Sequence, residues 1–88
     1  MKLKYTFEPV EMDEEIIFVP VGEGASQVRG VLKMNAEARE IVEMLKKETT
    51  ETAIVDALHA KYENDIETLT FYVTRVVNNL RSAGILAD

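Results

Sequence analysis

Few residues of this chain have side chains that can do covalent or metal chemistry. The 88 residues include no cysteine and one histidine, His59, which excludes thiolate zinc sites, thiol nucleophiles and multi-histidine metal centres within one chain. Ser26 and Ser82 are the only serines, and neither lies in the G-x-S-x-G context of an activated nucleophile. The glycines are too scattered for a phosphate-binding loop. We therefore expect a protein that is not an enzyme and holds no metal or cofactor.

The remaining candidates for chemistry have simpler interpretations. His59 flanks the apolar stripe of a predicted helix and has no cluster of partners, which favours a solvent-facing or hydrogen-bonded histidine over a catalytic one. The acidic residues Glu11, Asp13, Glu14 and Glu15 lack the ligand spacing and central glycine of a calcium loop. We expect them to form a solvated turn.

The charge balance narrows the classes of partner. The chain has 10 basic and 16 acidic residues, a net charge of −6, which argues against broad contact with a nucleic-acid backbone. No apolar run approaches the roughly 20 residues of a membrane span, and the start has no signal-peptide pattern. We therefore expect a cytoplasmic protein without a membrane partner.

The first part of the chain has the period of strands. A strand over residues 3–7 alternates apolar and polar side chains, and Pro9 is expected to end it or place it at an edge. A second strand over 16–19 is expected to stop at Pro20, and a third covers 28–34. The loops between them are short, which favours an antiparallel meander because parallel strands need longer crossovers.

The second part has the period of helices. Asn35, Thr49 or Thr50, and Asp65 are expected to cap three helices, and Gly84 is a natural residue just past the last one. Lysines 46 and 47 are expected in the last turn of the first helix. Apolar residues recur at helical spacing in each helix. These stripes are Ala38, Ile41, Val42 and Leu45; Ile54, Val55, Leu58 and Tyr62; and Leu69, Val73, Val76 and Leu80.

This order of elements predicts an α+β fold. A β meander over residues 1–34 precedes a trihelical unit over 35–88, and together they make one domain over 1–88. Three helices joined by short turns are typical of a helix-turn-helix unit, and the small sheet beside them makes the whole winged-helix-like, with a three-stranded antiparallel sheet followed by a three-helix bundle.

Most of the chain, and most clearly its part from Leu32 to Leu86, resembles the pyrroloquinoline quinone biosynthesis protein D (PqqD-like) family. These small domains are also called RiPP recognition elements, because they serve ribosomally made, modified peptides. The segments that carry the resemblance are Leu32–Ala38, Glu40–Leu45, Glu48–Thr50, Ile54–Leu58, Lys61–Tyr62 and Leu80–Leu86.

The resemblance implies a peptide chaperone rather than an enzyme. Members bind the leader segment of a precursor peptide and present it to a modifying enzyme, often a radical S-adenosylmethionine (radical SAM) protein. The product is pyrroloquinoline quinone (PQQ) or another modified peptide. The family also implies that the leader adds as an extra strand to the third strand and lies in a groove against the third helix.

The third strand of the sequence fits strand addition. It contains no proline, and in a meander it lies at a sheet edge with unpaired backbone groups. Arg29 and Lys33 either meet acidic leader side chains or only deter aggregation as edge charges. The candidate peptide contacts on this strand are Val28, Arg29, Gly30, Val31, Leu32 and Lys33.

The third helix supplies the other candidates. Tyr72, Val73 and Val77 are assigned to peptide binding, with Tyr72 and Val77 at opposite margins of the apolar stripe. Either margin could line the groove. Phe71 lies nearly opposite the stripe, where it is either an incidental exposed aromatic or a contact to the modifying enzyme or to another copy.

Two other readings remain open. A DNA-binding winged helix would use Arg75, Asn78, Asn79 and Arg81 of the third helix, but residues 35–88 carry 6 basic and 10 acidic side chains, so we expect no nucleic-acid partner. The open edges also permit a homodimer that exchanges strands, as an alternative to a monomer.

Overall fold

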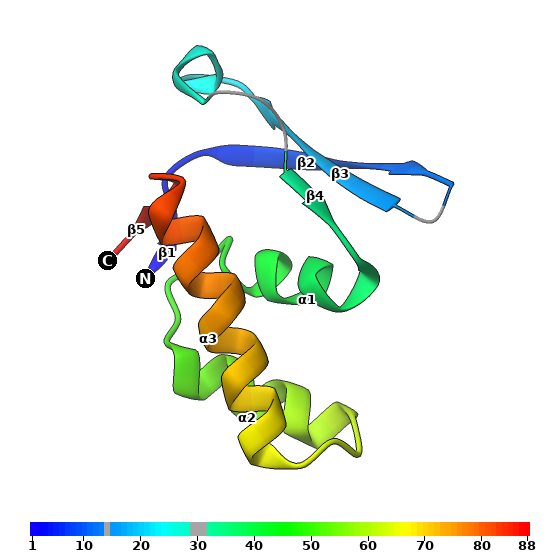
Figure 1. The fold of residues 1–88 in the computed structure, drawn as a ribbon. Helices are drawn as coiled ribbons and strands as arrows, with labels where there is room; N and C mark the ends of the chain where they lie inside the picture. Colours follow the sequence, from blue (N-terminus) through cyan, green and yellow to red (C-terminus); the bar gives the residue numbers. More distant parts are fainter. Residues whose placement is uncertain (14, 29–31) are drawn as a thin grey trace.

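The computed structural model describes residues 1–13, 15–28 and 32–88. The elements in this part of the chain are β1 (Lys2–Leu3), β2 (Thr6–Met12), β3 (Glu15–Val21), the 3-10 turn η1 (Ala25–Gln27), β4 (Leu32–Met34), α1 (Ala36–Met44), α2 (Glu51–Lys61), α3 (Ile66–Ser82) and β5 (Leu86–Ala87). Strands β2, β3 and β4 form an antiparallel sheet in that order, and the helices follow it (Figure 1). The predicted α+β fold is confirmed.

Strands β2 and β3 are longer than predicted because neither proline ends its strand. Pro9 lies opposite Phe18 and Pro20 lies opposite Phe7 within a continuous ladder. A hydrogen-bonded antiparallel pair exchanges two N–H donors, and proline has none. These two pairs must therefore be the non-hydrogen-bonded pairs of the ladder, in which each proline nitrogen faces away from the partner strand.

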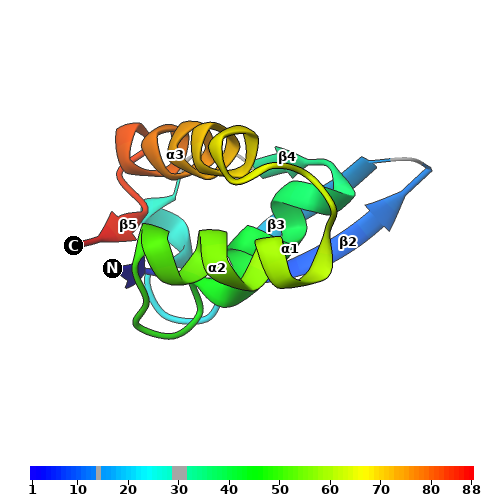
Figure 2. The ribbon, with the colours of Figure 1, turned by 90° about the horizontal axis from the view of Figure 1, so that it is seen from below.

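The tip of this hairpin corrects the predicted acidic turn. Glu11 belongs to β2 and Glu15 to β3, and the bend is at Asp13, whose φ of 56° is in the left-handed region that aspartate tolerates. Glu14 lies outside the described residues. The β2–β3 hairpin extends beyond the helices (Figure 2), and Val10 and Met12 near its end are exposed.

Of the predicted third strand over residues 28–34, the structure describes Val28 and Leu32–Met34, and only Leu32–Met34 form a strand, β4. Leu32, Lys33 and Met34 lie opposite Phe18, Ile17 and Ile16 of β3. Val28 follows η1 with an extended backbone (φ −91°, ψ 125°). Arg29, Gly30 and Val31 lie outside the described residues.

Side chains cap all three helices as the sequence predicts. The acceptors are Asn35 Oδ1 for the N–H of Ala38 (2.9 Å), Thr50 Oγ1 for Ala53 (3.1 Å) and Asp65 Oδ1 for Thr68 (2.8 Å). Of the two predicted threonines, Thr50 is the cap. One prediction is wrong: α1 ends at Met44, so lysines 46 and 47 follow the helix instead of forming its last turn.

The sheet and the helices share one hydrophobic core. Phe7 and Phe18 from the hairpin are almost completely buried together with Ile41, Ile54 and Leu80 from the three helices. The predicted apolar stripes are buried throughout, with the exception of Tyr62, the C-cap residue after α2, which is exposed. Packing against the helices therefore holds the sheet in place, and it sets the distance between α3 and β4.

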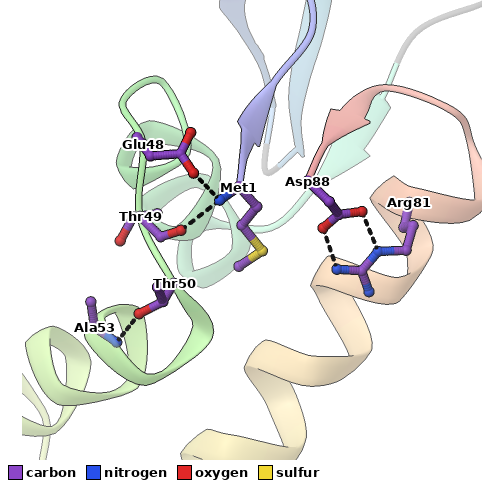
Figure 3. A network of polar contacts seen from close by, with 7 residues as sticks. All are labelled: Met1, Glu48, Thr49, Thr50, Ala53, Arg81 and Asp88. Atoms are coloured by element: carbon purple, nitrogen blue, oxygen red, sulfur yellow. Dashed lines mark hydrogen bonds and ion pairs between the residues drawn. The ribbon is translucent and has the colours of Figure 1, made fainter.

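The two ends of the described chain meet in a second, two-stranded sheet. Lys2 pairs with Ala87 and Leu3 with Leu86, so the predicted strand over residues 3–7 is broken after Leu3. The Met1 amine contacts the Glu48 carboxylate and donates to the Thr49 carbonyl at 2.8 Å (Figure 3). Two hydrogen bonds join the Arg81 guanidinium to the Asp88 carboxylate, at 2.8 and 3.0 Å.

Candidate functional site

The free edge of β4 presents the backbone of Lys33. Phe18 and Ile16 are two and four residues before Pro20 in β3, so their backbone groups point to the same side as those of Pro20, away from β2. The N–H and C=O groups of Ile16 and Phe18 therefore face β4. Leu32 and Met34 therefore use their backbone groups to bind β3. The N–H and C=O of Lys33, between them, face the opposite side. No other described strand pairs with that side, which leaves it open to an added strand.

A groove of about 350 Å³ lies between this edge and α3. Lys33 and Met34 line one side, and Tyr72, Arg75, Val76 and Asn79 line the other. The helical residues are three or four positions apart, so they share one face of α3. A peptide paired with Lys33 would consequently lie against this face.

Asn35 and Tyr72, which both line the groove, form a hydrogen bond with each other. The Tyr72 hydroxyl donates to Asn35 Oδ1 at 3.0 Å, and the same oxygen accepts the bond that caps α1. Burial raises the pKa of the Tyr72 hydroxyl above its ordinary value of 10.0, so it stays protonated and a donor at neutral pH. Both residues also line an adjoining cavity of about 410 Å³ beside Leu58 and Leu69.

The candidate contacts of the third strand differ in exposure. Lys33 is exposed and lines the groove, whereas Leu32 and Val28 are half-buried and pack against the core. The candidates Arg29, Gly30 and Val31 lie outside the described residues. The backbone of Lys33 is therefore the part of the predicted strand edge whose orientation the register defines.

The third helix requires a correction. Val73 and Val77 are 0% exposed, because the apolar stripe of α3 turns them into the core that the helices share with the sheet. They offer no surface to a ligand, and we remove them from the candidate contacts. Tyr72 remains, so the margin of the stripe that lines the groove is the one that carries Tyr72.

Sequence reasoning did not assign six residues of the groove to peptide binding, and one of them, Ala38, was placed in the apolar stripe of the first helix. Met34 was part of the predicted third strand, and Asn35 was taken only as a helix cap, although it lines the groove as well. Arg75 and Asn79 follow Tyr72 by three and seven positions. Residues at this spacing lie on the same helix face, so the sequence could have indicated them. Val76 was assigned to the core, and 8% of its surface remains exposed.

Phe71 is exposed as predicted, with 72% of its surface accessible. It is the most exposed of the large hydrophobic residues that the structure describes. It precedes Tyr72 and does not line the groove.

The described part of the chain holds neither a cluster of metal-ligating residues nor a helix able to cross a membrane. No three residues among its histidines, aspartates and glutamates gather closely enough to hold a metal ion. None of its helices combines the length and the apolar character that crossing a bilayer requires.

Comparison with known proteins then identifies the family. A family profile described as coenzyme PQQ synthesis protein D (PqqD) matches residues 21–86. The chain belongs to the PqqD family. The matched residues of this PqqD-family protein include β4, all of α3 and the lining of the groove. The resemblance drawn from Leu32 onwards is confirmed.

A solved structure shows the same fold. It is described as TbiB1 in complex with the TbiA(beta) leader peptide, and it matches with a TM-score of 0.71 over 100% of both chains at 22% sequence identity. At this identity the likeness concerns the fold of the PqqD-family protein alone. No curated protein matches the sequence.

Proposed function

We propose that this PqqD-family protein is a RiPP recognition element that binds the leader of a ribosomally made precursor peptide by strand addition. The leader pairs antiparallel to β4 through the outward-facing N–H and C=O of Lys33, and its side chains enter the groove against α3. Backbone hydrogen bonds supply affinity, and the groove supplies selectivity. The chain catalyses nothing itself and acts in the cytoplasm, where precursor peptides are made.

One observation carries the proposal: among the described residues, the outer edge of β4 has no strand partner, and it lies beside a groove that α3 lines. An exposed edge alone would be a hazard for aggregation, but α3 limits access to this edge and leaves room for an extended chain. The TbiB1 fold, solved with a leader peptide, supports the same use of this architecture.

The modifying enzyme that receives the leader is proposed to be a radical SAM enzyme, and the product PQQ or another modified peptide. Membership of the PqqD family supports this assignment. It is tested by mixing a candidate precursor peptide with a candidate radical SAM enzyme, with and without this protein. Modification should be faster when the PqqD-family protein is added, and an unchanged rate would remove this enzyme as the partner.

The leader proposal is tested by titrating ¹⁵N-labelled protein with the leader half of a candidate precursor peptide. Amide shifts should concentrate at Lys33 and Met34 on β4 and at Arg75 and Asn79 on α3. Val10 and Met12 at the hairpin end serve as internal controls and should not move. A scrambled leader of equal composition should cause no saturable shifts. Leader binding that shifts the hairpin end and leaves β4 and α3 unchanged would contradict the proposal.

A further inference from the structure

The groove has a charge opposite to that of the whole chain. Acidic residues outnumber basic ones by 16 to 10, yet the charged side chains among the described groove residues are Lys33 and Arg75, both basic. Within the described part of the chain, neither forms an ion pair. Glu15 lies in a smaller adjoining cavity beside Lys33 and does not line the groove. Two residues with basic side chains, Lys33 and Arg75, thus line a space that a ligand would fill.

Asn35 adds a fixed donor to this space. Its Oδ1 accepts from the Ala38 N–H at 2.9 Å and from the Tyr72 hydroxyl at 3.0 Å. Because a backbone N–H can only donate, these bonds establish which end of the amide is oxygen. The Nδ2 group at the other end has two hydrogens, and it makes no hydrogen bond to any described residue. Asn35 lines the groove, so these donors are available to a ligand.

We propose that the groove selects leaders that carry an aspartate or glutamate in the segment that pairs with β4. The carboxylate lies between Arg75 and Lys33 and accepts a hydrogen bond from Asn35 Nδ2. This inference rests on the proposed function and names the class of peptide that the same site prefers. Hydrogen bonds between ionised partners are roughly twice as strong as neutral ones, so a leader with glutamine in place of glutamate should bind less tightly.

Charge complementarity carries the choice of an acidic peptide. A basic segment would place like charges beside two cations. A wholly apolar segment would cover their charged groups and give them no partner, which costs free energy. An acidic side chain satisfies both cations and the amide together.

The first test is selection from a phage-displayed library of random peptides of about 12 residues, enough for a strand and its flanks. Wild-type protein should enrich aspartate or glutamate at one position by about threefold or more over the input library, a difference within reach of one charge-assisted bond. Arg75→Gln and Lys33→Gln should each reduce this enrichment while apolar preferences at other positions remain.

The outcomes of the selection are distinguishable. Enriched peptides with no acidic preference would overturn the inference and leave the proposed peptide binding intact. A library from which wild-type protein enriches nothing would contradict both.

The second test is Asn35→Asp, measured with the peptide that wild-type protein enriches most. Aspartate is an equally good helix cap and keeps an acceptor for Ala38 and Tyr72, but it replaces the two donors with a second acceptor and adds a negative charge. The thermal midpoint should stay within a few degrees of wild type, while affinity for the acidic peptide falls about tenfold or more.

The matched control is Asn64→Asp, which adds the same charge in the neighbouring cavity outside the groove. It should bind the acidic peptide nearly as tightly as wild type. A purely structural role for Asn35 would lower the thermal midpoint and leave affinity unchanged, and Asn35→Asp protein that binds like wild type would overturn the role of the amide.

Discussion

Glu40 illustrates how a single carboxylate joins two helices. It lies in α1, and its oxygens accept from Lys61 Nζ and, at 2.8 Å, from the Tyr62 hydroxyl at the end of α2. The bond from Lys61, followed by the bond from Tyr62, lowers the pKa of Glu40 below its ordinary value of 4.5. The same contact raises the pKa of Lys61. Ionised Glu40 is therefore favoured by folding.

This shift predicts part of the acid sensitivity of the protein. A carboxylate with a lowered folded-state pKa contributes stability above its unfolded pKa and loses it as the pH falls through the folded value. As the pH is lowered from about 5 to about 3, the thermal midpoint of wild type should therefore decrease. The thermal midpoint of Glu40→Gln should decrease less steeply over this range. Asp65→Asn is the comparison, because it removes another carboxylate whose pKa is lowered in the folded protein. A Glu40→Gln profile parallel to wild type would refute the assignment.

Phe71 is either an incidental exposed aromatic or a contact to the proposed modifying enzyme or to another copy, and one substitution tests the contact to the enzyme. Because 72% of its surface is exposed, Phe71→Ser should change the free energy of unfolding by less than about 0.5 kcal/mol. Leader affinity should be unchanged, since Phe71 does not line the groove. Affinity of the leader-bound protein for the modifying enzyme, measured by calorimetry, should fall about tenfold, as for truncation of an aromatic anchor. Unaltered affinity for the enzyme would exclude this contact.

At the scale of the elements, the two neighbouring residues Leu32 and Lys33 should respond oppositely to proline. The N–H of Lys33 faces the open edge, so Lys33→Pro should leave the β3–β4 ladder intact and reduce leader affinity tenfold or more, roughly the effect of a lost backbone bond and a blocked edge. The N–H of Leu32 faces β3, so Leu32→Pro should lower stability by about 1–3 kcal/mol.

Urea denaturation and the leader titration of the two variants separate these effects. Lys33→Pro protein that is folded and binds leader as wild type does would show that the leader does not pair with this edge.

Elements with local signals could be predicted from the sequence, and elements that depend on a partner could not. The caps Asn35, Thr50 and Asp65 act within their own helix turns, so the residue type and the following apolar spacing were sufficient. Pro20 was expected to end its strand, and Pro9 was expected to end its strand or place it at an edge; β2 continues through Pro9 and is an edge strand. Whether a proline is tolerated depends on which backbone groups face the neighbouring strand, and that register is set by the whole hairpin.

The candidate site, too, was predictable where local spacing decides and not where packing between elements decides. Helical period placed Tyr72 and Val77 at the margins of one stripe, but the period alone does not tell which margin meets the sheet. The packing of β4 beside α3 decides it: Tyr72 lines the groove and Val77 is buried. The third strand was predicted to lie at an edge from its place in the meander, and the absence of proline predicted that this edge can accept another strand. The register adds that the backbone of Lys33 faces outward.

For the whole molecule, the pairing of β1 with β5 should matter more than its length suggests. Leu3 and Leu86 are opposite each other and almost completely buried. Leu86→Ala should cost about 2–4 kcal/mol in the free energy of unfolding, because it leaves a cavity at the junction of both ends with the core.

Lys2→Ala, in the same short sheet but exposed, is the matched control and should be nearly neutral in urea denaturation. A Leu86→Ala protein as stable as this control would show that β5 contributes little to the fold.

The adjacency of Lys2 and Ala87 has a consequence for how this fold can be combined with others. Directly paired antiparallel residues are about 4.5–5.5 Å apart at their Cα atoms, and Figure 1 shows both ends of the chain at the same place. A connection into the fold and one out of it can therefore leave side by side. Such a unit can be inserted into a surface loop of a larger protein, as well as attached at one end, without separating β4 from α3.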